Sequence, residues 1–326
     1  MTTPITNRQS GAALITVLMI VAAMSAVALG LSQTVMRATL RAKAFDAQVQ
    51  SNWYAVAAEQ FALSAIADIN RQHEGRLFAG APGLDTPVTF TIDGGSITAV
   101  TRDATNCFNL NRLARGTRPS TDFDAALTFY GDLISATELG SGRGEGLTAA
   151  LVDWMDADTT PATYGAEDAY YAGLDVPYRT SGQPLANLSE LSAIRNYLPG
   201  VIEVLKPNVC VRPANEVHKL NINTLRAEQA PLLVAQMSGL ISLEDARQLI
   251  AARPFGGWQN VGDFLKEPAI AKIAADYRNE DTLSVTATHM DVKAHVTYRG
   301  RVKTVHILFR TAPGEVVRTL SRQEGT

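Results

Sequence analysis

An acidic segment in the middle of the chain carries the residues best suited to chemistry. Asp153, Asp156 and Asp158 lie within one short stretch, and Glu167 and Asp168 follow closely. Clustered carboxylates on a loop supply the hard oxygen ligands that Ca²⁺ prefers. No histidine lies in this stretch, which argues against zinc. A calcium site formed by these five residues is one interpretation. The alternative is an acidic surface loop whose aspartates cap helices.

The other reactive side chains do not form a catalytic pattern. The five histidines are scattered, and none stands beside a serine or cysteine in a nucleophile motif. No glycine-rich phosphate loop occurs in the sequence. Asp153 and Asp156 could in principle form an acid–base pair, but metal binding or helix capping explains them better. We expect a protein that is not an enzyme.

Cys107 and Cys210 are the only two cysteines. Two cysteines cannot by themselves build a disulfide scaffold or a zinc site. In an oxidising compartment they would form one bridge, and in the cytosol they would be two buried thiols. The choice depends on where the chain is located.

The N-terminal region bears on that location. A polar stretch ends at Gly11, and the apolar run over residues 12–31 is long enough to cross the roughly 30 Å core of a bilayer as a helix. A secretory signal peptide has a shorter apolar core, of about 7–15 residues, with its cleavage site after the core. A plain signal anchor is a second alternative. The junction between Gly11 and Ala12 favours a third, the leader of type IV pilin-like proteins, which is cut after a glycine and before the apolar helix.

Helical periodicity continues beyond the apolar run. No proline occurs between Pro4 and Pro82. One set of apolar residues recurs at spacings typical of a single helix face: Phe45, Val49, Trp53, Val56, Leu63 and Ile66. We predict one long helix from the membrane to a globular head. The alternative is a membrane helix followed by a separate amphipathic helix.

The rest of the chain has a helical middle between two β-rich regions. The predicted strands are residues 87–92, 96–100, 282–288, 291–298 and 301–309. Asp93-Gly94-Gly95 between the first two predicts a hairpin. Val316 and Val317 are expected to add a short edge strand, and residues 320–326 a polar tail. A helical block that interrupts a β-layer indicates an inserted domain.

Within that block, the region from Leu220 to Phe264 resembles a helix-hairpin-helix, or SAM-like, module. DNA-binding modules of this kind present glycine-flanked backbone amides to phosphate, but here the turn contains only Gly239. Nearby acidic residues offset the basic ones: Glu228, Glu244 and Asp245 stand against Arg226 and Arg247. The net charge of the chain is −3, whereas phosphate binding needs a positive potential. We expect packing or partner contact here, and no nucleic acid.

Four motifs carry a resemblance to a known family. They are CFNLN at 107–111, LVDWMDAD at 151–158, GAEDAYY at 165–171 and KLNINT at 219–224. Their order and spacing resemble those of the K subunits, minor pseudopilins of type II (general) secretion systems. The resemblance implies an α+β fold, in which a pilin-like long N-terminal helix packs on a small antiparallel sheet and a large α-domain containing the helix-hairpin-helix module is inserted.

The resemblance divides the chain into five parts. They are a prepilin leader (1–11), a transmembrane helical part (12–31), the rest of the helix with the first β segment (32–104), the inserted α-domain (105–280), and the C-terminal β segment with the tail (281–326). The leader would be cut between Gly11 and Ala12 by prepilin peptidase.

The resemblance also implies a function and a location. The chain would be a single-pass protein of the inner membrane of a Gram-negative bacterium, with its head in the periplasm. It would cap or initiate the pseudopilus tip and so support the export of folded proteins across the outer membrane. Its partners would be minor pseudopilins I and J, then H, and the major pseudopilin. A membrane-anchored DNA-binding or uptake protein is the alternative function.

Two expectations follow from this assignment. K subunits bind calcium in the α-domain, which supports Ca²⁺ as the ligand of the acidic segment. The periplasm is oxidising, so Cys107 and Cys210 are expected to form a disulfide.

Thr16 bears on the position in the fibre. Pilin-like subunits usually carry a glutamate at the fifth position of the mature chain, where it is thought to pair with the N-terminal amine of a neighbour. Here that position is Thr16. A carboxylate inside the membrane costs roughly 2.5–3.5 kcal/mol unless it is paired. A subunit that meets no partner amine has no reason to keep a carboxylate at this position. Thr16 therefore favours a position of this chain at the tip of the fibre. The alternative is that threonine is simply tolerated, with its hydroxyl bonded back to the helix.

Overall fold

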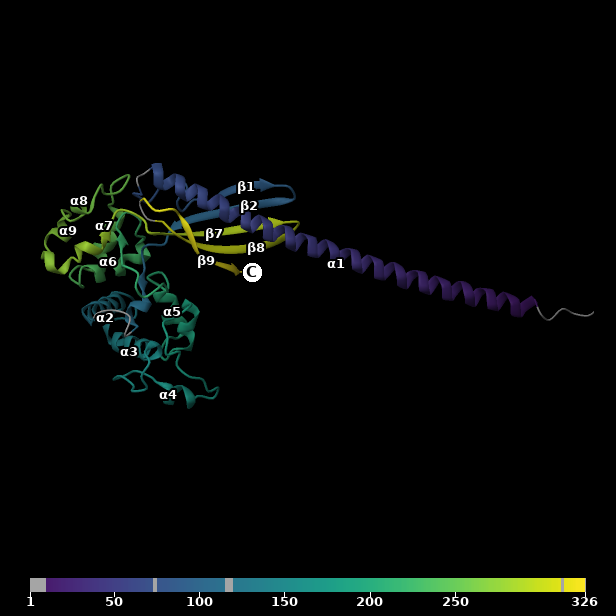
Figure 1. The fold of residues 1–326 in the computed structure, drawn as a ribbon, viewed down its shortest axis with the longest axis horizontal. Coiled ribbons are helices and arrows are strands. Elements are labelled where there is room, and N and C mark those ends of the chain that lie inside the picture. The colour runs from purple at the N-terminus through teal and green to yellow at the C-terminus, as the bar shows by residue number, and fades with distance from the viewer. Residues whose placement is uncertain (1–9, 73–74, 115–119, 312–313, 326) are drawn as a thin grey trace, which may run out of the picture.

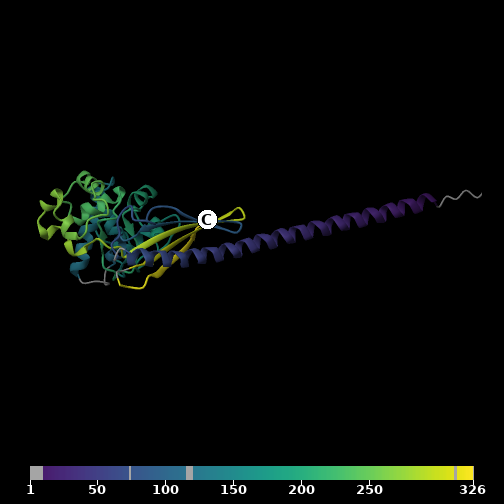
Figure 2. The same cartoon turned by 90° about the horizontal axis from the view of Figure 1, so that it is seen from above.

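The computed structural model describes residues 10–72, 75–114, 120–311 and 314–325. One long helix, α1 (Ser10–Gln72), leads into a head made of an antiparallel sheet and a helical insertion (Figures 1 and 2). This arrangement confirms the predicted fold class. Residues 1–9 of the expected leader lie outside the described part of the chain.

The helix α1 is continuous over 63 residues, so the alternative of two separate helices is wrong. At 1.5 Å per residue it is roughly 95 Å long. Its N-terminal part is long and apolar enough to cross a membrane, since an 18-residue window has a mean hydropathy of 2.6 and is not buried at all. Within this part, the Thr16 hydroxyl donates to the carbonyl of Ala13 at 2.9 Å, so its polar group is satisfied inside the helix.

The face of α1 that packs on the head consists mostly of small residues. The buried positions are Ala47, Ser51, Ala55, Ala58, Ala62 and Ile66. The bulky apolar residues whose spacing predicted the helix differ in burial: Ile66 is 1% exposed, whereas Phe45 and Trp53 are 72% and 65% exposed. Small side chains allow the helix to lie close to the sheet, whose valines and isoleucines fill the space between them.

The main sheet is entirely antiparallel, with the strand order β1-β2-β7-β8-β9. The strands are β1 (Val88–Ile92), β2 (Gly95–Asp103), β7 (His289–Tyr298), β8 (Arg301–Arg310) and β9 (Arg318–Gly325). The predicted hairpin forms between β1 and β2. Gly95 is required there, because a Cβ would lie 1.8 Å from the carbonyl oxygen of Thr297.

The C-terminal segment departs from expectation. Instead of a short strand at Val316 and a polar tail, residues Arg318–Gly325 form β9, an edge strand paired with β8. Its side chains are almost all exposed. The backbone groups of β8 would otherwise be unpaired on this side, so the pairing depends on the main chain rather than on an apolar pattern.

The insertion contains eight α-helices among its described residues. They are α2 (Ser120–Ser135), α3 (Gly144–Met155), α4 (Asp168–Ala172), α5 (Pro199–Leu205), α6 (Ala230–Gln236), α7 (Leu243–Ala251), α8 (Val261–Phe264) and α9 (Pro268–Ala271). Two short parallel ladders accompany them: β3 (Phe108–Asn109) with β4 (Val209–Cys210), and β5 (Leu220–Asn221) with β6 (Leu283–Ser284). Of the strand expected at 282–288, only β6 forms, and it pairs inside the insertion.

Two separate cores follow from this division. The larger core lies within the insertion and includes Phe108, Tyr130 and Leu151. The smaller core lies between α1 and the sheet and includes Ile66 and Val292. The insertion and the sheet are therefore two packed units joined at the point where the chain leaves β2.

That junction is a buried polar cluster. The Asp103 carboxylate accepts hydrogen bonds from the Asn221 side chain at 2.8 Å and from the Thr224 hydroxyl at 2.6 Å. It also accepts one from the amide of Thr105 at 2.7 Å. The Asn106 side chain accepts from the amide of Asn221 at 2.7 Å and donates to its carbonyl at 3.0 Å. Asn221 thus joins parts of the chain that are 115 or more positions apart in the sequence.

Removal of the Asn221 side chain should test the junction. Asn221→Ala leaves a buried carboxylate and the carbonyl of Leu77 without their amide donor. We expect the free energy of unfolding to fall by about 2–4 kcal/mol, because unsatisfied buried polar groups lose their full desolvation cost. Urea titration followed by tryptophan fluorescence measures the change.

Asn187→Ala is the matched control. Asn187 caps a short 3₁₀ helix at the surface, so its loss should cost only about 1 kcal/mol. Equal losses in the two variants would contradict a special role for the junction.

Candidate metal centre

The acidic segment runs from the last turn of α3 to the start of α4. Asp153 lies near the end of α3, and Asp156 is the residue at which that helix terminates. Glu167 immediately precedes α4, in an extended conformation. The chain therefore folds back on itself between 156 and 167, and carboxylates from both ends of the loop meet.

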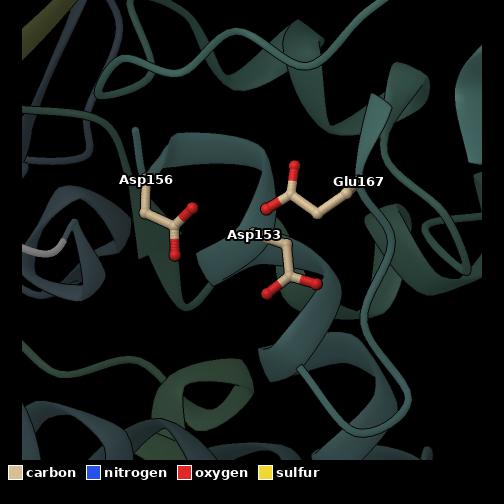
Figure 3. A group of neighbouring side chains, drawn as sticks. All are labelled: Asp153, Asp156 and Glu167. Carbon is tan, nitrogen blue, oxygen red and sulfur yellow. The ribbon is translucent and has the colours of Figure 1, made fainter. Parts of the chain in front are cut away.

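Three of the five expected ligands come together (Figure 3). Asp153, Asp156 and Glu167 each offer a carboxylate oxygen, and these atoms all lie within 4.8 Å of one another. The three residues are only 2%, 6% and 3% exposed. Buried clustered carboxylates are costly unless a proton or a cation neutralises them.

The raised pKa of Glu167 reflects this cost of burying clustered carboxylates. Burial, together with the negative charges of Asp156 and Asp153, raises the pKa of Glu167 to about 7. Asp158 adds to the same effect, and the nearby amide of Asp168 offsets only part of it. Neither oxygen of the Glu167 side chain has a well-formed hydrogen bond among the described residues, although both are buried. A cation placed between the three carboxylates would remove this penalty.

The other two expected ligands lie apart from the cluster. Asp158 is exposed, and its carboxylate accepts from the amide of Thr160 at 2.8 Å. Asp168 faces the other way, because its Oδ1 accepts from the amide and the hydroxyl of Thr180. These hydrogen bonds lower the pKa of Asp168. In this structure the cluster of three carboxylates therefore does not include Asp168, whereas the negative charge of Asp158 acts on it from nearby.

Gly165 contributes to the site in a way that the sequence analysis missed. A Cβ at Gly165 would lie 1.9 Å from the Asp153 carboxylate, so only glycine allows the loop to approach so closely. The carbonyl of Gly165 is held in turn by the Arg195 guanidinium at 2.9 Å. In the sequence, the glycine two residues before Glu167 was the signal that could have indicated this close approach.

The donor set fits a hard divalent cation, because all three side chains offer carboxylate oxygen, the type of ligand that Ca²⁺ prefers. Soft or borderline metals prefer sulfur or imidazole ligands, which this group does not contain.

The cysteines lie at another part of the insertion. Cys107 and Cys210 form a disulfide, with their Cα atoms 5.7 Å apart. It lies beside the β3–β4 ladder and closes a loop between residues separated by 103 positions. In the chain-entropy model such a loop stabilises the fold by up to about 4–5 kcal/mol.

The helix-hairpin-helix region has the structure expected of a packing element. All of α6 is buried, and the turn after it places Gly239 against the carboxylate of Asp132. The first turn of α7 carries Glu244 and Asp245. This environment is unsuited to a phosphate backbone, which needs positive charge.

Comparisons with known proteins give a consistent result. Residues 106–214 and 220–286 each match a family model described as "Type II secretion system (T2SS), protein K". Similar proteins include type II secretion system protein K of Pectobacterium carotovorum subsp. carotovorum, 35% identical over 260 residues and 78% of each chain. The protein K of Klebsiella pneumoniae is 34% identical over 275 residues and 82% of each chain.

The fold is similar to a solved structure as well. A chain in the crystal structure of the GspK–GspI–GspJ complex from the enterotoxigenic Escherichia coli Type 2 Secretion System aligns with a TM-score of 0.74. The two chains are 31% identical, and the alignment covers 88% of this chain and 99% of the other.

Proposed function

Because this chain belongs to the protein K family of type II secretion systems and is a minor pseudopilin, we propose that it stands at the tip of the pseudopilus. The observation that carries this proposal is the combination of α1 with the insertion. The helix offers a shaft like that of other pilin-like subunits, and the insertion adds bulk to one side of the head (Figure 1). Such bulk would obstruct another subunit stacking above it.

The partners in this proposal are the minor pseudopilins I and J, then H, and the major pseudopilin. The similar solved chain is part of a complex with GspI and GspJ. On this chain, Phe45 and Trp53 of α1 are largely exposed beyond the alanine face. Exposed aromatic residues at one helix face are typical anchors of protein interfaces. The role is structural, in support of protein export, with no catalytic step.

The membrane anchor in this proposal is the N-terminal half of α1. It crosses the inner membrane once, and the head lies in the periplasm, where the Cys107–Cys210 bond is stable. Thr16 lies in this half as the fifth residue after the proposed cleavage site. A tip subunit meets no partner amine there, so it needs no carboxylate.

Calcium is the proposed ligand of the acidic cluster. Asp153, Asp156 and Glu167 would hold it, with Asp158 at the edge of the site. The bound ion would neutralise the buried carboxylates and so fix the end of α3 to the start of α4. Its role here is to stabilise the insertion.

Leader processing is the first prediction. Cleavage by prepilin peptidase after Gly11 gives a mature chain that begins at Ala12. Intact-mass spectrometry of the membrane-extracted protein reads the start directly. A mature start near Leu31, as after an ordinary signal peptide, would exclude the pilin-like anchor.

Calcium dependence is the second prediction. A ligand at 100 times its dissociation constant adds about 2.7 kcal/mol to the free energy of unfolding. Chelation should therefore lower the Tm of the purified protein. Asp156→Asn should abolish this sensitivity. In chelator that variant should be at least as stable as the unmodified protein, because one of three repelling charges is gone.

Asp276→Asn serves as the control, since it removes an exposed carboxylate elsewhere in the insertion and should keep the calcium response. A melting curve that does not change on chelation would leave the cluster as a plain acidic loop.

Position in the fibre is the third prediction. A label on the head should be found at one end of isolated pseudopili. Trp53→Glu should prevent this, because a charge at the exposed helix face opposes burial against partner helices. Electron microscopy with gold-conjugated label gives the distribution.

Gln48→Glu adds the same charge to another side of α1 and should still be found at the end. Label spaced along the shaft would refute the tip position while leaving membership of the fibre intact.

A further inference from the structure

Two adjoining cavities in the insertion have no role in the function described above. The first, of about 740 Å³, lies between the start of α3, Tyr170 and the segment 195–201. The second, of about 320 Å³, lies between α2, α3 and residues 162–164. Glu145 and Tyr164 line both, so the two cavities adjoin, and together we call them the α3 groove. α3 lies on the side of the insertion away from the sheet (Figure 1).

The first cavity is basic. Arg143 and Arg195 both line it, and neither forms an ion pair with any residue that the structure describes. The Arg195 guanidinium lies 4.7 Å from the centre of the Tyr170 ring and donates to the carbonyl of Gly165, which fixes its position. Glu145, at the boundary of the two cavities, is the one carboxylate among the lining residues described. The two guanidinium groups outnumber the one carboxylate in the lining of this cavity, so the cavity favours an anionic ligand group.

The second cavity is mostly apolar. Phe123 and Leu127 of α2 form one wall, and Ala149 and Val152 of α3 form the other. An aliphatic or aromatic side chain would remove this surface from water, at roughly 25 cal/mol for each Å². The groove therefore has a basic end and an apolar end, separated by Tyr164.

The boundary between the two ends has an unusual backbone. Tyr164 has a φ of +68° and is 65% exposed, and Asn196 opposite it has a φ of +71°. Left-handed conformations of non-glycine residues are costly and concentrate at functional sites. Gly146 lies between these two residues: a Cβ on it would be 3.5 Å from the Asn196 side-chain nitrogen and 4.0 Å from the Cβ of Tyr164. The glycine keeps the floor of the groove open.

We propose that the α3 groove binds a peptide segment of another protein in which an acidic residue is followed by a leucine or phenylalanine. The carboxylate would pair with Arg143 and Arg195, and the apolar side chain would occupy the second cavity. An inorganic phosphate or a lipid headgroup would use only the basic end. This inference does not depend on the position of the chain in the fibre.

Fluorescence polarisation on the full-length protein in detergent tests this proposal. The probe is a pool of fluorescein-labelled hexapeptide amides with aspartate followed by leucine at the two central positions. A second pool has lysine in place of the aspartate, and a third has serine in place of the leucine. We expect saturable binding of the first pool only. Arg143→Gln should weaken it about tenfold, as for the loss of one charge-assisted hydrogen bond.

Gly146→Met fills the groove and should abolish binding without lowering the Tm, because methionine favours a helix more than glycine does. The matched controls should bind as the unmodified protein does: Arg247→Gln removes an exposed arginine on α7, and Gly131→Met fills open space on α2. Equal binding of the lysine or serine pool, or no binding of any pool, would overturn the proposal. Complete competition by inorganic phosphate would instead identify a simple anion site and equally overturn it.

Discussion

The buried carboxylate of Asp103 is the constraint on which the placement of the insertion depends. Asp103 is the last residue of β2, and it is only 5% exposed. A buried charge needs several hydrogen bonds, and here the donors come from the first residues of the insertion and from its second half, at Asn221 and Thr224. If the two halves separated, the charge would lose its partners. The hydrogen bonds around Asp103 therefore hold both halves at one place on the sheet. They also fix where the acidic centre and the α3 groove lie relative to the sheet.

Different physical effects hold the two ends of the insertion together. Near the sheet the interactions are satisfied hydrogen bonds and the Cys107–Cys210 bond, none of which needs a ligand. At the end of α3 the opposite holds, because three buried carboxylates repel one another. The close approach of Gly165 to Asp153 leaves little room for the loop to relax this repulsion. The interactions near the sheet therefore stabilise the insertion without a ligand, whereas at the end of α3 the proposed cation would have to offset the repulsion.

Local sequence patterns predicted the parts of this molecule that local forces determine. Continuous apolar and proline-free sequence predicted α1, and Asp93-Gly94-Gly95 predicted the first hairpin, because the required conformations are properties of a few neighbouring residues. The buried face of α1 was not predictable in this way. Bulky residues usually mark the core, but close approach to the sheet selected alanines such as Ala55 and Ala58. The edge strand β9 was missed because its pairing depends on backbone groups of β8, while its own side chains are almost all exposed and show no alternating apolar pattern.

The candidate site shows the same limit at finer scale. The acidic composition identified the segment, but neighbouring carboxylates in a sequence need not share a site. Glu167 is extended and Asp168 begins α4, so their side chains point in different directions. One enters the cluster, and the other accepts from Thr180, twelve residues farther along. Which of these two carboxylates enters the cluster is decided by the path of the loop between residues 156 and 180. Neither composition nor residue spacing specifies that path.

The attachment of the insertion also bears on how such a chain can change over generations. Asp103 and Met290 face each other in register on adjacent antiparallel strands, so the chain leaves the sheet and returns to it at neighbouring positions. To the sheet, residues 104–289 are equivalent to a hairpin turn, and closure entropy grows only slowly with the length of such a connection. A lineage can therefore enlarge, reshape or exchange this part without disturbing the strand register or the helix beneath it.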